Sequence, residues 1–225
     1  MYILGIETST QICSAALLHN SVLLAEVRLN LRNVHASRLF EIIASLFADA
    51  GISSTDVDGI GVSIGPGSFT GLRIGLSAAK GLAFPSDIPV VPVPTMQALA
   101  ANAPITTGTI CPILKSRAQE FYAAIYARDI FVDTQVQSVQ VVSQDDLIEF
   151  VPNDAMLIGT TIGLRDLAVW PETISFAPQQ FAMPSAISVG IIAAQNILTG
   201  HHYELESLEP SYFQEFIAGK PKSTV

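Results

Sequence analysis

The chain is poor in charged residues, cysteine and tryptophan. Only 14% of its 225 residues are charged, against roughly 25% in a typical domain. With so few charges at the surface, part of that surface is expected to be covered by another protein. The two cysteines, Cys13 and Cys111, lie far apart, and no Cys or His cluster has zinc spacing. The composition therefore predicts no bound metal and favours two buried, reduced thiols.

No segment has the pattern of a signal peptide or a membrane span. Met1 is followed by a strand pattern rather than by a basic segment and a hydrophobic signal core. Two long uncharged stretches, 88–114 and 174–203, are interrupted by prolines. The best helix within them, 185–199, is shorter than the ~20 residues that a bilayer requires. We therefore expect a cytoplasmic protein that does not enter a membrane.

Basic residues are scarce as well: 11 Lys and Arg face 20 Asp and Glu, for a net charge of -9. An acidic chain repels nucleic acid unless a basic partner supplies the phosphate contacts. Arg28, Arg32 and Arg38 are the only clustered basic residues. We expect the isolated chain to bind RNA weakly.

Hydrophobic spacing predicts alternating strands and helices in an order that occurs twice. Leu39, Ile42, Ile43, Leu46 and Phe47 recur at helical spacing, with Gly51 after them as a C-cap. The predicted elements are strands at 2–6, 13–18, 22–29, 57–64, 90–93, 110–114, 121–127, 135–142 and 156–159, and helices at 35–50, 71–84, 95–101, 145–150 and 185–198.

A repeated βββαβα order is the layout of two ribonuclease-H-like lobes, the α/β architecture of actin, Hsp70 chaperones and sugar kinases. Proline, glycine and threonine accumulate near residues 102–108, which marks a boundary. We expect a first lobe over 1–104 and a smaller, degenerate lobe over 105–225. In the tail, residues 209–217 show a mixed secondary-structure pattern, and residues 220–225 are expected to be frayed. We expect the tail to return to the first lobe.

The most distinctive motif is Gly65-Pro66-Gly67-Ser68-Phe69-Thr70-Gly71-Leu72-Arg73. It joins a predicted strand to a predicted helix, and Ser68 or Thr70 can cap that helix. Such a junction suits an anion or a partner's backbone. It is neither a P-loop nor a dinucleotide fingerprint, so a tight turn without a ligand is the competing interpretation.

A second polar set follows the first strand: Glu7, Thr8 and Ser9. A carboxylate can hold hydrated magnesium and hydroxyls can meet phosphate oxygens, so these three are the candidate cofactor-binding residues. The alternative, which we favour, is that the hydroxyls stabilise a turn through bonds to the backbone. We therefore predict no cofactor.

Distinctive motifs lie at 1–10, 13–17, 35–39, 65–73, 117–122 and 208–212. Together they resemble the TsaB (YeaZ) family, which takes part in making threonylcarbamoyladenosine in bacterial tRNA. Two positions depart from the family pattern: Lys115 stands where an aspartate is usual, and Gln214 where an arginine is common.

The resemblance implies a paralogue of the catalytic protein TsaD without catalytic residues. TsaD carries an HxxxH pair that helps to bind a metal, whereas no histidine here has another four residues on. The implied function is a scaffold that binds and activates TsaD, works with TsaE, pairs with itself when alone and meets tRNA only within the complex. The alternative is an active enzyme of the same fold, either an ATP-binding phosphotransferase or a glycoprotease-like peptidase, although Ser68 lacks a nucleophile elbow.

We expect the helices at 35–50 and 71–84 to form one partner interface. Gly71, Gly75, Ala78 and Ala79 recur at three- and four-residue steps, and small side chains let another helix approach closely. The competing interpretation is packing against the protein's own sheet. The candidate interface residues are His35, Leu39, Ile42, Ser68, Thr70, Gly71, Leu72, Arg73, Gly75, Ala78, Ala79 and Leu82.

Overall fold

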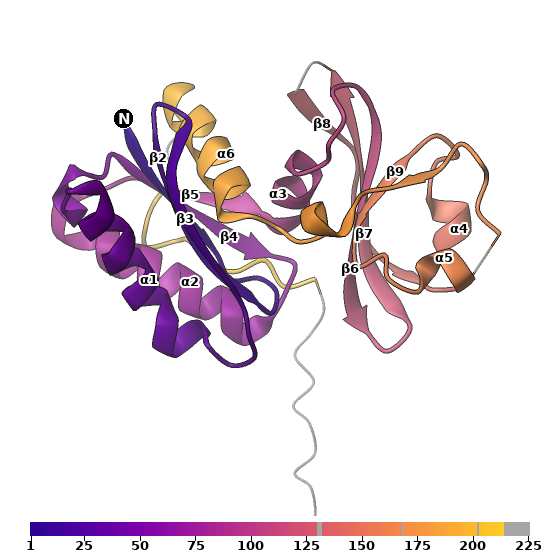
Figure 1. The fold of residues 1–225 in the computed structure, drawn as a ribbon, viewed down its shortest axis with the longest axis horizontal. Coiled ribbons are helices and arrows are strands. Elements are labelled where there is room, and N and C mark those ends of the chain that lie inside the picture. Colours follow the sequence, from indigo (N-terminus) through magenta and orange to yellow (C-terminus); the bar gives the residue numbers. More distant parts are fainter. Residues whose placement is uncertain (130–131, 168, 202, 214–225) are drawn as a thin grey trace, which may run out of the picture.

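The computed structural model places two five-stranded sheets next to one another, as Figure 1 shows. It describes residues 1–129, 132–167, 169–201 and 203–213. The first sheet contains β1 (Tyr2–Glu7), β2 (Ile12–His19), β3 (Val22–Asn30), β4 (Gly59–Gly65) and β5 (Val90–Pro94). The second contains β6 (Gly108–Arg117), β7 (Glu120–Asp129), β8 (Val132–Ser143), β9 (Met156–Gly159) and β10 (Ser175–Phe176).

The two sheets share one strand order. It is β3-β2-β1-β4-β5 in the first and β8-β7-β6-β9-β10 in the second. In each sheet the first three strands pair antiparallel and the last two join in parallel. The predicted fold class, two α/β lobes with repeated topology, is confirmed.

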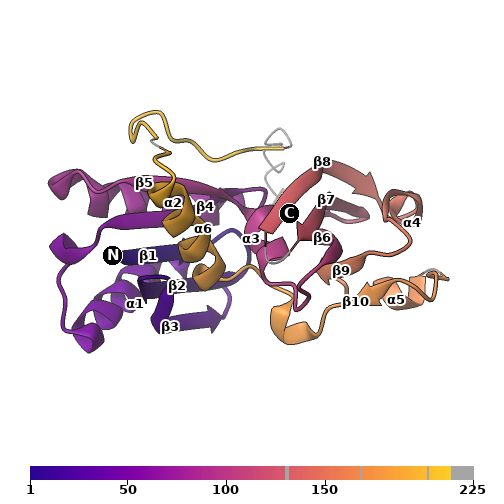
Figure 2. The same ribbon diagram turned by 90° about the horizontal axis from the view of Figure 1, so that it is seen from above.

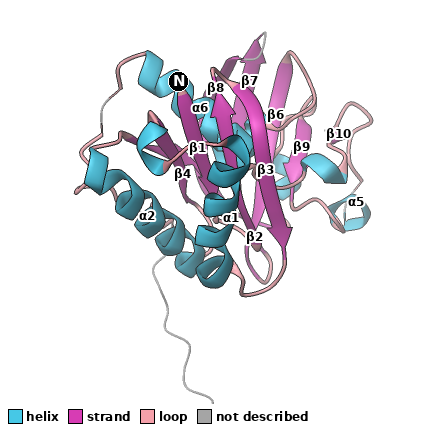
Figure 3. Cartoon of the chain, turned by 60° about the vertical axis from the view of Figure 1, so that its left-hand side comes forward, coloured by secondary structure: helices cyan, strands magenta, loops and turns pink. Residues whose placement is uncertain are grey.

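Helices cover both faces of the first sheet. Figure 3 shows α1 (His35–Ala50) and α2 (Phe69–Ala83) side by side on one face, where they contact each other. The apolar side chains of α1 recur at helical spacing and form a core with β1, β2 and β4. Gly51 ends α1 in the left-handed region at φ 67°, as the sequence predicts.

The other face carries α6 (Ala186–Leu198), and α3 (Thr95–Ala101) lies between the two sheets (Figure 2). Met96 and Leu99 of α3 join the core beneath the second sheet, whereas Ala98 packs towards the first. The second lobe's outer helices, α4 (Leu147–Phe150) and α5 (Leu164–Leu167), are single turns. Short 3-10 turns occupy Ser54–Asp56, Phe84–Ser86 and Gln179–Phe181.

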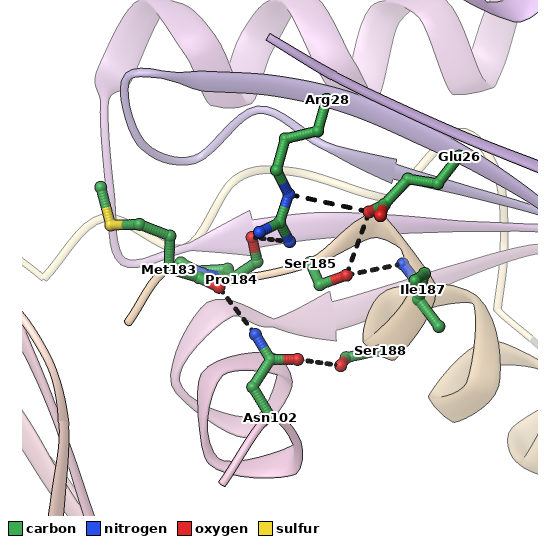
Figure 4. A network of polar contacts seen from close by, with 8 residues as sticks. All are labelled: Glu26, Arg28, Asn102, Met183, Pro184, Ser185, Ile187 and Ser188. Carbon is green, nitrogen blue, oxygen red and sulfur yellow. Dashed lines mark hydrogen bonds and ion pairs between the residues drawn. The ribbon is translucent and has the colours of Figure 1, made fainter. Parts of the chain in front are cut away.

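A polar network holds the segment through which the chain returns from the second sheet to α6 (Figure 4). Arg28 donates to the Pro184 carbonyl at 3.4 Å, and Asn102 donates to the Met183 carbonyl at 2.7 Å. The Ser185 hydroxyl accepts from the Ile187 N–H at 3.1 Å and caps α6. The helix α6 therefore packs on the first sheet although it follows the second sheet in sequence. The lobe boundaries at 104 and 105 stay a prediction.

Residues 205–213 form a strap along one side of α2. Leu205 and Leu208 pack on the core of the first lobe. The Ser211 N–H donates to the Ile64 carbonyl at 2.7 Å, and the Lys80 ammonium donates to the Glu206 carbonyl at 3.2 Å. The predicted mixed tail falls only partly on the described residues, and Gln214 and the stretch 220–225 lie outside them.

Two smaller predictions can be checked against the fold. Cys13 and Cys111 are both free and buried, as predicted. Among the described residues, no helix is long and apolar enough to cross a membrane.

Candidate functional site

The glycine-rich motif packs against the turn that follows β1. A Cβ placed on Gly67 would lie 2.2 Å from the Ser9 carbonyl oxygen, and one on Gly71 would lie 2.1 Å from that of Thr8. The Ser68 N–H donates to the Ser9 carbonyl at 2.6 Å. The two most distinctive sequence motifs therefore form one structural unit, and the glycines are required by close backbone approach.

The same motif fixes the start of α2. The Ser68 hydroxyl accepts from the Gly71 N–H at 3.2 Å, which confirms the predicted helix cap. Gly65 has a φ of 124°, and a Cβ there would lie 2.5 Å from the Ser211 carbonyl oxygen. The strap thus crosses directly over the loop, and Gly65 is needed both for its backbone conformation and for this crossing.

Much of the predicted partner interface is buried inside the chain, which corrects the sequence analysis. A Cβ on Gly75 would lie 2.2 Å from the Thr8 hydroxyl oxygen. The small residues therefore let α2 approach its own sheet closely, and the competing interpretation was right for this face. The predicted interface residues that are buried are Leu39, Ile42, Gly71, Leu72, Gly75, Ala78 and Ala79.

Glu7 and Thr8 lie beneath the surface. The Glu7 carboxylate accepts hydrogen bonds from the Ser9 N–H at 2.6 Å and from the Ser9 hydroxyl at 2.5 Å. Burial raises the pKa of Glu7, although these hydrogen bonds oppose the shift. The contacts are those of a stabilised turn, and of the three candidate cofactor residues only Ser9 reaches the cavity described next.

A cavity of about 840 Å³ lies between the two lobes. Ser9, Gly67, Ser68, Thr70 and Gly71 line it from the β1 turn and the start of α2. The segment between β3 and α1 adds Leu31, Arg32, Asn33, His35 and Ala36, and the second lobe adds Leu114, Lys115, Ser116, Tyr122 and Thr160. The remaining lining residues are Thr10, Gln11, Ile74 and Met183.

The cavity brings together predicted and unpredicted residues. His35 lines it, but its Nε2 donates to the Ile12 carbonyl at 3.0 Å, a contact within the first lobe. Tyr122 and Thr160 on the opposite wall were not predicted as site residues; the only sequence signals were the 117–122 motif and the unusual Lys115.

Within the described ranges, no Asp or Glu lines the cavity, and no group of three His, Cys, Asp or Glu residues forms a metal site. The described lining therefore offers no carboxylate ligand for a magnesium ion.

The exposed members of the predicted interface lie against the strap or at the rim of the cavity. The Arg73 guanidinium stacks 3.9 Å from the Phe69 ring centroid and donates to the Tyr212 hydroxyl at 2.9 Å. The Phe69 and Tyr212 rings lie 5.0 Å apart. Ser68 and Thr70 are exposed at the cavity rim, and Leu82 is half-buried.

Comparison with known proteins identifies the family. The model of the tRNA N6-adenosine threonylcarbamoyltransferase family (TsaD) matches residues 23–216. The Escherichia coli "tRNA threonylcarbamoyladenosine biosynthesis protein TsaB" is 28% identical, over 98% of this chain and 97% of its own length. YeaZ from Pseudomonas aeruginosa superposes with a TM-score of 0.80 at 27% identity, covering 94% of this chain and 99% of that one.

More distant structures support the fold alone. The activator of 2-hydroxyisocaproyl-CoA dehydratase from Clostridium difficile has a TM-score of 0.50 at 11% identity, over 94% of this chain and 100% of its own. It agrees with the two-lobed architecture of the actin and sugar-kinase type. With matching motifs, topology and nearly full-length similarity, the chain belongs to the TsaB (YeaZ) branch of the tRNA N6-adenosine threonylcarbamoyltransferase family.

Proposed function

We propose that this protein is a non-catalytic scaffold that binds and activates TsaD for threonylcarbamoyl transfer to adenosine in tRNA. Membership in the TsaB family places the chain in this modification pathway. In the cytoplasm it pairs with TsaD, associates with TsaE, and forms a homodimer when TsaD is absent. It meets tRNA through the complex, because its net charge of -9 disfavours direct binding.

The observation that carries the proposal is the surface formed by the exposed sides of α1 and α2. We call it the outer helix face and define it by Phe40, Ala44, Ala48, Ser77 and Gly81, all exposed. Phe40 is 55% exposed. An exposed aromatic ring on α1, together with small exposed residues on α1 and on the adjacent α2, suits close packing against helices of a partner.

The cavity supports the non-catalytic part of the proposal. A peptidase needs a free nucleophile with a base in reach, whereas the Ser68 hydroxyl caps α2 and the His35 Nε2 bonds to a backbone carbonyl. A phosphotransferase needs an acid near the phosphate and its magnesium, and among the residues that the structure describes no Asp or Glu lines this cavity.

The test compares two exposed apolar residues changed to glutamate. Phe40→Glu on the outer helix face is expected to weaken binding to TsaD at least about tenfold, because it buries a charge in the interface. Val136→Glu is the matched control: Val136 is 65% exposed but lies on β8 of the second lobe. Size-exclusion chromatography with light scattering measures the complex, and the thermal unfolding midpoint confirms that both variants fold.

A transfer assay completes the test. With an activated threonylcarbamoyl donor supplied, TsaD, TsaE and the wild-type chain together are expected to modify tRNA, with a much lower yield when Phe40→Glu replaces the wild type. Equal binding and equal yield for the two variants would refute the outer helix face as the TsaD surface. Turnover of ATP by the chain alone at about 1 per second, an enzyme-like rate, would refute the non-catalytic role.

A further inference from the structure

We propose that TsaD makes a second contact with this chain where the strap meets the start of α2, and that Arg73 there holds a carboxylate of TsaD. The contact site consists of Phe69, Arg73 and Tyr212, and we call it the arginine anchor. The inference rests on the proposed scaffold function and deepens it, because it adds a charged residue to the partner surface and names the chemical group that this residue meets.

The Arg73 side chain is held in one orientation within the chain itself. The central carbon of its guanidinium lies 3.9 Å from the centroid of the Phe69 ring and 5.8 Å from that of the Tyr212 ring. Its Nε donates to the Tyr212 hydroxyl at 2.9 Å. An arginine that is already fixed by stacking and by a hydrogen bond loses less conformational entropy when a partner binds. The anchor is therefore preorganised for recognition.

The outer edge of the Arg73 guanidinium is available to a partner. Its terminal nitrogens, Nη1 and Nη2, carry four of the five N–H groups of a guanidinium. Within the described ranges Arg73 forms no ion pair, whereas Arg38 pairs with Glu41 at 2.9 Å and Arg128 with Asp133 at 2.6 Å. Two parallel N–H groups match the two oxygens of a carboxylate. An aspartate or glutamate of the partner fits this edge.

The acidic residues of the strap make the position of this contact selective. Glu206 and Glu209 are exposed, and Lys80 donates to the backbone carbonyl of Glu206 at 3.2 Å. A carboxylate of TsaD is repelled by these side chains and attracted at Arg73. Charges arranged in this way suppress wrong registers and fix the correct one.

The arginine anchor continues the outer helix face, which is why we assign it to TsaD. Arg73, Ser77 and Gly81 are all exposed and follow one another at steps of four residues along α2. Eight residues of a helix span about 12 Å. A TsaD helix that packs over the small residues therefore reaches the anchor. Arginine and tyrosine are also among the residue types that most often dominate binding energy at interfaces, and Tyr212 is 45% exposed.

The test measures the dissociation constant of the full chain with TsaD, without tRNA, at about 50 and about 500 mM NaCl. Arg73→Gln is expected to weaken binding about tenfold or more at low salt, because the TsaD carboxylate loses its partner. The difference from the wild type should shrink at high salt, since salt screens an exposed ion pair. Arg165→Gln is the matched control: its guanidinium also stacks on a ring, 4.6 Å from the centroid of Phe176, but it lies on α5 of the second lobe.

A second variant separates contact with TsaD from support of the strap. Tyr212→Phe removes the hydrogen bond to Arg73 but keeps the guanidinium and an aromatic ring. It should weaken TsaD binding less than Arg73→Gln does, with the salt dependence of the wild type. If Arg73 only supports the strap, the two variants weaken binding equally and neither changes the salt dependence, which overturns the proposal. The thermal unfolding midpoint confirms that each variant folds.

The remaining outcomes distinguish the anchor from the scaffold function. Weaker, less salt-dependent TsaD binding in Arg73→Gln, with wild-type binding in Arg165→Gln, supports the anchor. Unchanged binding in Arg73→Gln, while Phe40→Glu weakens it, overturns the anchor and leaves the scaffold function standing. If TsaD binding is unchanged but self-pairing or the yield of modified tRNA falls, Arg73 meets a second copy or RNA instead, and the anchor is overturned. Absence of wild-type binding to TsaD overturns the scaffold function and the anchor with it.

Discussion

The inner and outer sides of α2 carry similar small residues in opposite surroundings. Gly75 on the inner side faces Thr8, where a Cβ would lie 2.2 Å from the hydroxyl oxygen. Gly81 on the outer side has nothing within 4 Å of the same position. A glycine in a helix can therefore mark a close approach inside the molecule or an open surface, and residue type alone does not distinguish them.

The two sides of α2 have different roles. Gly71 and Gly75 on its inner side let the helix approach the β1 turn closely, and Gly67 does the same in the loop before the helix. The outer side of the helix carries the small exposed residues Ser77 and Gly81, one and two turns after the exposed Arg73. The inner side determines stability, and we assign partner binding to the outer side. Substitutions on the two sides are expected to have different effects.

The largest effect is expected from Gly75→Leu. A leucine there must displace Thr8 or move α2 away from β1, and overpacking of this kind costs about 3 kcal/mol, occasionally more. The matched variant Gly81→Leu points into open space and should fold at least as well as the wild type, since leucine is the better helix former. Urea unfolding followed by circular dichroism measures both free energies.

Equal free energies of unfolding for the two leucine variants would show that the inner side of α2 is no more tightly packed than the outer side. Loss of stability in Gly81→Leu alone would reverse the assignment of the two sides. Either result would contradict the close packing of Gly75 against Thr8.

The next effect concerns the side of α2 that the strap covers. Tyr212→Phe removes the hydroxyl that accepts from Arg73 at 2.9 Å and is expected to cost about 0.5–1.5 kcal/mol. Tyr2→Phe is the control, because the Tyr2 ring stacks 4.4 Å from His19 while its hydroxyl has no partner in the described part of the chain. Thermal unfolding of both variants gives the comparison, and equal midpoints would argue against a stabilising strap.

Local sequence patterns were sufficient for most of the fold. Each predicted strand and helix has an observed counterpart, and α1 (His35–Ala50) has the predicted bounds. The short turn between the strands predicted at 13–18 and 22–29 has positive φ at Asn20 and Ser21, as a tight hairpin needs. The helix predicted at 71–84 instead runs from Phe69 to Ala83. Boundaries of this kind depend on a few dihedral angles.

The site was less predictable, because it depends on contacts between distant segments. Ser9 and Ser68 could be selected from local motifs, and both line the cavity. Lys115 and Thr160 reach it only because the second sheet lies beside the first, which no local pattern reports. The same limit explains the error at Gly75: helical spacing defines a face of small residues, but not what that face contacts.

The smallest effect tests the outer side alone. Gly81→Ala is expected to stabilise the protein by about 0.5–1 kcal/mol, because alanine loses less backbone entropy than glycine within a helix. The added methyl group meets no atom within 4 Å, so no contact inside the chain offsets the gain. Ser77→Ala on the same side is the control for a change of helix propensity without a glycine, and its gain should be smaller. Urea unfolding measures both, and a loss of stability in Gly81→Ala would mean that Gly81 is packed against the protein. Binding to TsaD adds a second measurement: if the partner helix packs directly over Gly81, the alanine variant gains stability but binds more weakly, so the two measurements change in opposite directions.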